Sequence, residues 1–214
     1  MVRDRLSALA PERAKHAYRL LRKRLGHDIH ERVNRVTVSH IYRYMHANQF
    51  VDGCKVLDAA CGSGYGSMML TRASEYVGID LDPLAVAEAT REFPEFTFTR
   101  GSIYDLPFED ASFSALTSFE TLEHVDKPAR ALGEFSRVLQ PGALLVGSIP
   151  IDHPDRVYHF RPYSIAEARD IFGSDPRLQV RGLFLQSKSL ITECDDATLN
   201  AWPGGTLVAH LYRV

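Results

Sequence analysis

One stretch of this chain constrains its fold more than any other: residues 56–67, which read VLDAACGSGYGS. Residues 56–60 form an apolar run with the length of a buried strand, and glycines follow at 62, 64 and 66. Glycine permits a tight turn and a close approach of the backbone to a ligand. Residues 67–73 have helical composition, and a helix beginning there would offer unpaired N–H groups to an anion. The stretch therefore predicts an α/β sheet with a nucleotide site at its carboxyl edge.

A second short strand is predicted over residues 76–79, and Asp80 ends it about twenty residues beyond the glycines. A carboxylate at this place can accept hydrogen bonds from both hydroxyls of a ribose. The G-x-G-x-x-G pattern of nicotinamide dinucleotide sites is incomplete, because Ser67 stands where the last glycine would be. A nicotinamide-dependent oxidoreductase and a non-catalytic nucleotide-binding module are therefore the weaker alternatives.

Strand-like and helix-like segments alternate along the rest of the chain. This alternation predicts a doubly wound parallel sheet with helices on both faces. A capping box, Ser164-x-x-Glu167, marks the start of the last predicted helix, which ends near residues 172–173. The other predicted helices cover residues 83–92 and 127–139, and the other strands cover residues 96–100, 113–119, 143–149, 180–187 and 206–213.

The first fifty residues differ in character from the remainder. Two helices are predicted there, one between Pro11 and Gly26 and one over residues 31–48. Residues 1–35 carry ten Lys and Arg against four Asp and Glu, although the whole chain has a net charge of −2. We expect residues 1–50 to form a helical lid and residues 51–214 the catalytic domain. Because this segment is basic, RNA and protein are alternative substrates.

Composition limits the class of protein further. The three cysteines show no metal-ligand spacing and no disulfide framework, which is typical of a reducing compartment. The N-terminal stretch has no apolar signal core, and no apolar run is long enough to span a membrane. We expect a cytoplasmic protein with no metal and no membrane span.

Four separated segments resemble one family, the class I S-adenosylmethionine-dependent methyltransferases. Residues 58–66 resemble its motif I, and residues 100–113, RGSIYDLPFEDASF, resemble its adenine-side loop. Residues 118–125, SFETLEHV, and 137–145, RVLQPGALL, resemble the segments around its fourth and fifth strands. The resemblance implies a Rossmann-like, seven-stranded, mostly parallel sheet with an antiparallel last strand. It also implies S-adenosyl-L-methionine as the cofactor.

The same resemblance implies which residues hold the cofactor. Asp58 and the glycine loop would hold the methionine end, and Asp80 the ribose. Ser102 stands where the family often has Asp beside the adenine, so this contact departs from the family pattern. The residues expected to bind the cofactor are Asp58, Ala59, Ala60, Cys61, Gly62, Ser63, Gly64, Asp80, Leu81, Ser102, Ile103, Ser118 and Phe119.

Candidate catalytic groups follow two of the predicted strands. Glu120 and His124 are four residues apart, so on a helix the carboxylate could orient the imidazole and raise its pKa. The loop after residue 149, IPIDHPDRVYHFRPYS, is dense in polar side chains. We predict that the general base is one of His159, Glu120, His124 and His153, and that the acceptor contacts are Tyr158, Arg161 and Asp152.

A narrower resemblance concerns the acceptor. Residues 33–67, 118–125 and 157–164 resemble small methyltransferases associated with glycosyltransferases in bacterial polysaccharide synthesis. It implies O-methylation of a small molecule or of a sugar or glycan. Methyl transfer needs no metal, but a hydroxyl acceptor must lose its proton to a base. Residues 118–121 read SFET instead of an Asn/Asp-Pro-Pro-aromatic sequence, so nucleic acid is the less favoured partner.

Overall fold

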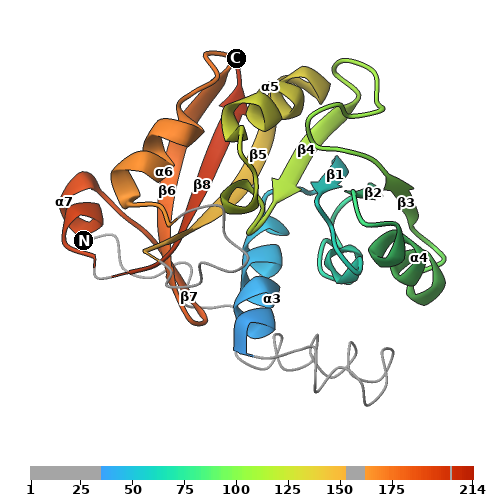
Figure 1. Ribbon diagram of the computed structural model, residues 1–214, viewed down its shortest axis with the longest axis horizontal. Helices are drawn as coiled ribbons and strands as arrows, with labels where there is room; N and C mark the ends of the chain where they lie inside the picture. The colour runs from blue at the N-terminus through green and yellow to red at the C-terminus, as the bar shows by residue number, and fades with distance from the viewer. Residues whose placement is uncertain (1–34, 153–161, 203) are drawn as a thin grey trace.

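The computed structural model describes residues 35–152, 162–202 and 204–214 (Figure 1). The strands are β1 (Lys55–Ala59), β2 (Glu75–Asp80), β3 (Thr97–Arg100), β4 (Phe113–Ser118), β5 (Leu139–Ile151), β6 (Leu178–Ser187), β7 (Leu190–Glu193) and β8 (Gly205–Arg213). The helices are α3 (Arg35–Ala47), α4 (Pro83–Glu92), α5 (Pro128–Val138), α6 (Ile165–Phe172) and α7 (Asp196–Asn200), with 3-10 turns η1 (Tyr65–Met68) and η2 (Leu122–His124).

The strands form a single sheet in the order β3-β2-β1-β4-β5-β8-β6-β7. The first five strands of this order pair in parallel, and β8, β6 and β7 pair antiparallel. The predicted doubly wound, mostly parallel sheet with an antiparallel end is therefore confirmed. The predicted number of seven strands is wrong by one, because the sheet has eight.

The additional strand is β7, which forms a hairpin with β6. The turn between them contains Lys188 with φ +55°, a left-handed conformation that non-glycine residues adopt infrequently. Hairpin turns of this length usually carry Asn-Gly or Asp-Gly. Lys188 and Ser189 stand here instead, so the turn carries no residue pair typical of a hairpin.

The helix predicted over residues 67–73 is also wrong, since only the short turn η1 forms. The backbone groups that would continue a helix are used by the loop before β1. The Arg72 N–H donates to Asn48 Oδ1 at 2.9 Å, and the Arg72 carbonyl accepts from the Gly53 N–H at 2.9 Å. The Ser74 N–H donates to the Cys54 carbonyl at 2.8 Å, so the segment is held in turns.

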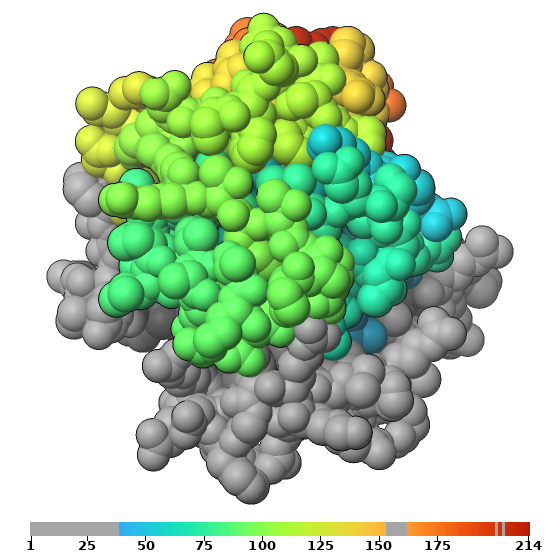
Figure 2. Space-filling model, turned by 90° about the vertical axis from the view of Figure 1, so that its right-hand side faces the viewer, coloured from blue at the N-terminus to red at the C-terminus, as the bar shows by residue number. Residues whose placement is uncertain are grey.

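Each face of the sheet has its own core, because successive side chains of a strand point to opposite faces. Leu57 and Ala59 of β1 pack in the core beneath α5 and α6, which lie side by side over β5, β8 and β6 in Figure 1. Val56 packs in the other core with Ile41 and Met45 of α3. Helix α3 is therefore an integral layer of the fold. Figure 2 shows the face at the β3 end, formed mainly by the chain around α4 and β3.

Two buried histidines join α3 to the sheet. His46 Nε2 lies 2.8 Å from His210 Nε2 on β8, and the side chains are only 2% and 5% exposed. One ring must donate and the other accept, so at least the accepting ring is neutral. Burial, followed by the neighbouring imidazole, lowers the pKa of His46 to about 3, and burial lowers that of His210 to about 4.

This pair predicts a loss of stability in acid. Below pH 6.5 the unfolded chain binds protons at both histidines, whereas the folded chain does so only near pH 3 to 4. The free energy of unfolding should fall between pH 7 and pH 5 by about 1 to 2 kcal/mol for each histidine. In the double variant His46→Leu/His210→Leu both partners are apolar, so its free energy of unfolding should fall less over this pH range. Urea unfolding of both proteins at the two pH values measures the difference, and equal losses would contradict the prediction.

Candidate cofactor and acceptor site

The predicted site residues come together at one edge of the sheet. Strands β1 and β4 are neighbours, but the chain leaves them in opposite directions, toward β2 and toward β5. Ligands of open α/β sheets bind at such a switch point, outside the carboxyl ends of the strands. The glycine loop follows β1 here, and the segment beginning at Phe119 follows β4.

The glycine loop combines close packing with an open surface. Gly64 has φ +78°, and a Cβ there would lie 2.6 Å from Ala89 Cβ of α4 and 2.6 Å from the Phe98 ring. Gly62 has φ +56°, but a Cβ there would meet nothing within 4 Å. Gly64 is therefore required for packing against α4, while Gly62 leaves room for a ligand beside the backbone.

Asp80 closes this loop from the end of β2. One carboxylate oxygen accepts from the Gly62 N–H at 2.8 Å, and the other accepts from the Asp82 N–H at 2.9 Å. Asp80 is only partly buried, and a carboxylate offers about four acceptor positions. The side chain can therefore hold the loop and still accept hydrogen bonds from a ribose diol.

Asp58 lies in β1, before the glycine loop. Its carboxylate is fully buried and accepts hydrogen bonds from three hydroxyls: Tyr44 at 2.9 Å, Tyr76 at 2.7 Å and Thr117 at 2.8 Å. Burial raises the pKa of Asp58 to about 6, although these hydroxyls favour the ionised form. The carboxylate thereby joins α3, β2 and β4 to β1, and its contact with the methionine end of the cofactor stays a prediction.

The other residues predicted to bind the cofactor here lie in the glycine loop or beside it. Ala59 is fully buried at the end of β1, and Ala60 turns the chain with φ +62°. The Cys61 N–H donates to the Ile79 carbonyl at 3.0 Å, and burial raises the pKa of its thiol. Ser63 is half-buried, and Leu81 is 64% exposed beside Asp80.

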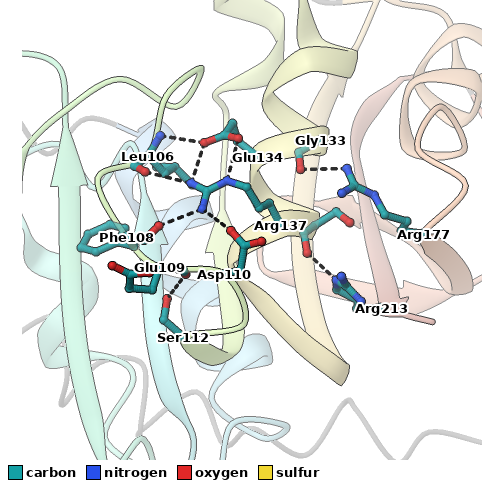
Figure 3. A network of polar contacts seen from close by, with 11 residues as sticks. Leu106, Phe108, Glu109, Asp110, Ser112, Gly133, Glu134, Arg137, Arg177 and Arg213 are labelled. Atoms are coloured by element: carbon teal, nitrogen blue, oxygen red, sulfur yellow. Dashed lines mark hydrogen bonds and ion pairs between the residues drawn. The ribbon is translucent and has the colours of Figure 1, made fainter.

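The adenine-side loop is anchored to α5 by one arginine (Figure 3). The Arg137 guanidinium donates to the Glu134 carboxylate and to Asp110, and it also donates to the carbonyls of Leu106 and Phe108 at 2.9 and 2.8 Å. These contacts engage Nε and both terminal nitrogens, the full fork of an arginine. The loop therefore has a fixed conformation at its carboxyl-terminal half.

Ser102 and Ile103 lie at the start of this loop. Ser102 Oγ accepts a hydrogen bond from the Tyr104 N–H at 3.1 Å, so its hydroxyl proton is available to another acceptor. Ile103 is partly buried against the core beneath α5. Both residues follow the carboxyl end of β3, and their contact with the adenine stays a prediction.

The segment after β4 carries an ion pair that the sequence did not predict. Glu120 has φ +49°, and its carboxylate accepts a hydrogen bond from Arg43 Nη1 of α3. Arg43 Nη1 also lies 3.3 Å from Ser148 Oγ, and the Arg43 side chain is only 1% exposed. Phe119 packs edge-on against Tyr44 with ring centroids 4.9 Å apart. Among the described residues, the buried Ser118 Oγ has no hydrogen-bond partner.

The pairing predicted between Glu120 and His124 takes a different form. The structure pairs Glu120 with Arg43 and places His124 Nε2 3.7 Å from Glu123 Oε1. The Glu123 carboxyl is buried, and neither oxygen has a hydrogen-bond partner within the described part of the chain. Burial, followed by the nearby Glu120 charge, raises the pKa of Glu123 well above its ordinary value.

A cavity of about 370 Å³ adjoins Glu120. It lies where β5, β6 and β8 meet the middle of α3. Asp152, one of the predicted acceptor contacts, lies on its wall, while His153, Tyr158, His159 and Arg161 fall outside the described residues. The residues that line the cavity are Ser39, Arg43, Glu120, Pro150, Ile151, Asp152, Gln186, Ser187, Lys188, Gly204, Gly205 and Thr206.

Most of the polar groups that the sequence analysis missed belong to α3. His40, Arg43 and Tyr44 lie on one face of α3, in the helix that was predicted over residues 31–48 without any site residue. Their partners are 25, 77 and 14 residues away in the chain, so no local pattern reveals them. Gln186, whose buried Oε1 has no partner among the described residues, was missed for the same reason.

Two general properties of the described residues bear on the chemistry. Within residues 35–152, 162–202 and 204–214, no group of three or more His, Cys, Asp or Glu side chains is arranged to hold a metal ion. No helix in these segments is long and apolar enough to cross a membrane.

Part of the chain is similar to known methyltransferases. Residues 57–147 match the family model described as "Methyltransferase domain". A Mycolicibacterium smegmatis protein named "Probable S-adenosylmethionine-dependent methyltransferase" is 31% identical over 128 residues, which cover 56% of this chain and 50% of that protein. A Mycobacterium leprae protein named "Phthiotriol/phenolphthiotriol dimycocerosates methyltransferase" is 34% identical over 100 residues, covering 44% and 37%.

The fold is shared with solved structures at lower identity. A chain from the complex of the Haloferax volcanii Trm112 methyltransferase activator with a methyltransferase superposes with a TM-score of 0.67 at 23% identity. The match covers 81% of this chain and 89% of that one. The chain spans half or less of the length of the two curated relatives. The comparisons favour the predicted S-adenosylmethionine site over a nicotinamide site.

The two loop glycines give a matched test of the packing. Ala at either position adopts an unfavourable left-handed conformation at a cost of roughly 1 kcal/mol, but only Gly64→Ala also clashes with α4 and β3. We expect Gly64→Ala to lower the free energy of unfolding by about 3 kcal/mol and Gly62→Ala by about 1 kcal/mol. Urea unfolding of both variants measures this, and equal losses would show that the contact with Ala89 and Phe98 is not limiting.

Proposed function

We propose that the chain is a class I S-adenosylmethionine-dependent methyltransferase and that it methylates a hydroxyl group of a small molecule or of a sugar or glycan. S-adenosylmethionine, the cofactor of this family, supplies a methyl group carried on a positively charged sulfur. The observation that carries the proposal is the position of the cavity. Glu120 lines this cavity and belongs to the segment that follows β4, which lies beside the glycine loop.

The residues around the switch point fit this cofactor. Gly62 leaves space beside the backbone, and Asp80 keeps acceptor capacity for the ribose hydroxyls. The buried Ser118 Oγ, which has no partner among the described residues, is a polar atom that a bound ligand could satisfy. Ser102 and Ile103 lie on the adenine side, on a loop fixed by Arg137.

The chemistry of the cavity favours a hydroxylated acceptor. Arg43 and Lys188 are balanced there by Glu120 and Asp152, and Gln186 adds a neutral amide. These side chains offer hydrogen bonds without a large excess of one charge. This property suits a polyhydroxylated, uncharged molecule. The name of the Mycobacterium leprae relative denotes a triol, which is again a molecule with hydroxyl groups.

A hydroxyl acceptor must lose its proton as the methyl group is transferred. Among the candidate bases, the Glu120 carboxylate is already engaged in an ion pair with Arg43. His124 is 40% exposed at the surface of η2. His153 and His159 remain candidates from the sequence. The alternative of RNA or protein as substrate depends on the basic residues 1–35, of which only Arg35 falls within the described residues.

Calorimetric titration with S-adenosylhomocysteine tests the cofactor site. Asp80→Ala removes the ribose acceptor and the clamp on Gly62, so we expect at least a hundredfold loss of affinity. The matched control is Asp82→Ala, which removes only the cap of α4 and should keep the affinity within about threefold. NAD should give no heat. Binding of NAD without S-adenosylhomocysteine would overturn the family-based proposal.

A second experiment tests the acceptor class. The protein is incubated with S-adenosylmethionine and a panel of methyl glycosides and aliphatic diols, and release of S-adenosylhomocysteine is measured. We expect turnover with a member of this panel, and a loss of about tenfold or more with Glu120→Gln or Asp152→Asn, whose side chains line the cavity. Arg181→Ala, an exposed change that does not line the cavity, is the control. Turnover with tRNA or a protein alone would contradict the hydroxyl-acceptor proposal.

A further inference from the structure

The imidazole of His40 has one nitrogen engaged and one free. Its Nδ1 lies 2.9 Å from the Tyr65 hydroxyl oxygen. Its Nε2 is buried and has no hydrogen-bond partner in the part of the chain that the structure describes. A buried polar atom without a partner is uncommon and calls for an explanation. The sequence analysis gave His40 no role in the site.

The ring lies between the two loops that form the ligand crevice. Tyr65 directly follows Gly64 of the glycine loop, so the hydrogen bond to Tyr65 fixes His40 beside that loop. Arg43 is three residues further along α3, on the same helical face, and pairs with Glu120 after β4. Ser39 and Arg43 of the same helix line the cavity, whereas His40 itself is not one of its lining residues. The free nitrogen is therefore close to the place where cofactor site and acceptor cavity meet.

We infer that His40 is the general base of the reaction proposed above, and this inference rests on that proposed function. Nε2 takes the proton of the acceptor hydroxyl as the oxygen forms its bond to the methyl carbon. The carbon–sulfur bond breaks, and its electron pair stays on sulfur. The products are a methyl ether, neutral S-adenosylhomocysteine and the His40 imidazolium, which later releases its proton to water.

The charges around the ring suit this role. Burial, followed by the Arg43 charge, lowers the pKa of His40 to about 4, while the Glu120 carboxylate opposes the shift. The ring is therefore neutral at pH 7 and can accept a proton, although the lowered pKa makes it a weaker base than a free imidazole. The Glu120 carboxylate offsets part of this loss, because it stabilises the imidazolium. Burial also raises the pKa of Tyr65, so the phenol stays protonated as a partner for Nδ1.

The hydrogen bond to Tyr65 must have one direction for this role. When Nδ1–H donates to the Tyr65 oxygen, Nε2 carries a lone pair and can act as a base. When the phenol donates instead, Nε2 carries the hydrogen and cannot. The tautomer is therefore a requirement of the inference that can be observed directly.

Nitrogen NMR of the full chain tests the inference without any acceptor. Long-range ¹H–¹⁵N spectra are recorded with S-adenosylhomocysteine and with S-adenosylmethionine, and His40 is assigned from the spectrum of His40→Asn. We expect the Nδ1–H tautomer in both complexes. We also expect the His40 resonances to shift between them, because only the second ligand carries a charge on sulfur. His46 and His210, which pair with each other in the core on the same side of the sheet, are internal controls and should not shift.

An Nε2–H tautomer, or identical His40 resonances in the two complexes, would overturn the inference. Failure of both ligands to bind would instead overturn the proposed function, so the two failures are distinguishable. With an acceptor found in the panel, His40→Asn should lower kcat about a hundredfold or more and leave the affinity for S-adenosylhomocysteine within threefold. Tyr65→Phe should lower kcat less, because it removes only the positioning hydroxyl. Equal activity of His40→Asn and the wild type would exclude the base.

Discussion

The rest of the site depends on the buried carboxylate of Asp58. Three hydroxyls from α3, β2 and β4 converge on it, so one residue of β1 joins four elements at the switch point. The packing around the Asp58 carboxylate leaves no room for a side chain on the neighbouring Gly66. A Cβ on Gly66 would lie 2.6 Å from Asp58 Oδ2 and 2.5 Å from the Tyr44 ring. The path of the glycine loop is thus set by the hydrogen bonds of Asp58 as well as by the ligand that the loop is built to hold.

The same carboxylate determines what α3 can contribute. Tyr44 is fixed to Asp58, and His40 lies one helical turn earlier, beside Tyr65 of the glycine loop. Arg43 lies on the same face of α3 and forms an ion pair with Glu120 across the crevice. Isolated, these three side chains would be an unremarkable part of an amphipathic helix. Their placement at the carboxyl edge follows from the anchor at Tyr44, so α3 is both a layer of the core and one wall of the site.

This arrangement explains how far the sequence could predict the molecule. Asp80, Gly62 and Gly64 belong to short patterns whose backbone geometry is local, and the structure places all three at one corner of the sheet. The capping box at Ser164 and the start of α4 at Pro83 were predicted for the same reason, because a cap needs only three or four residues. Asp58 was predicted as a site residue from its local motif, but its hydroxyl partners come from a helix and two strands, and no local pattern specifies them.

The missed features share this non-local origin. The pair between Arg43 and Glu120 spans 77 residues, and the pair between His46 and His210 spans 164. Glu120 and His124 have helical spacing, but Glu120 takes a left-handed conformation and the turn that follows is a short 3-10 turn. The i,i+4 geometry that would bring the two side chains together therefore does not form. A spacing argument fails wherever the backbone departs from the element on which it depends.

The two halves of the site also differ in what relatives can teach about them. The family match covers residues 57–147, and every predicted cofactor residue lies within that range. Of the residues that line the cavity, only Glu120 does, because the others come from α3 and from the chain after residue 149. Similarity to methyltransferases therefore informs the cofactor half, while the acceptor half is specific to segments outside the match. The chemistry of His40, Arg43, Gln186 and Asp152 has to be read from this structure itself, since a shared fold does not fix the substrate.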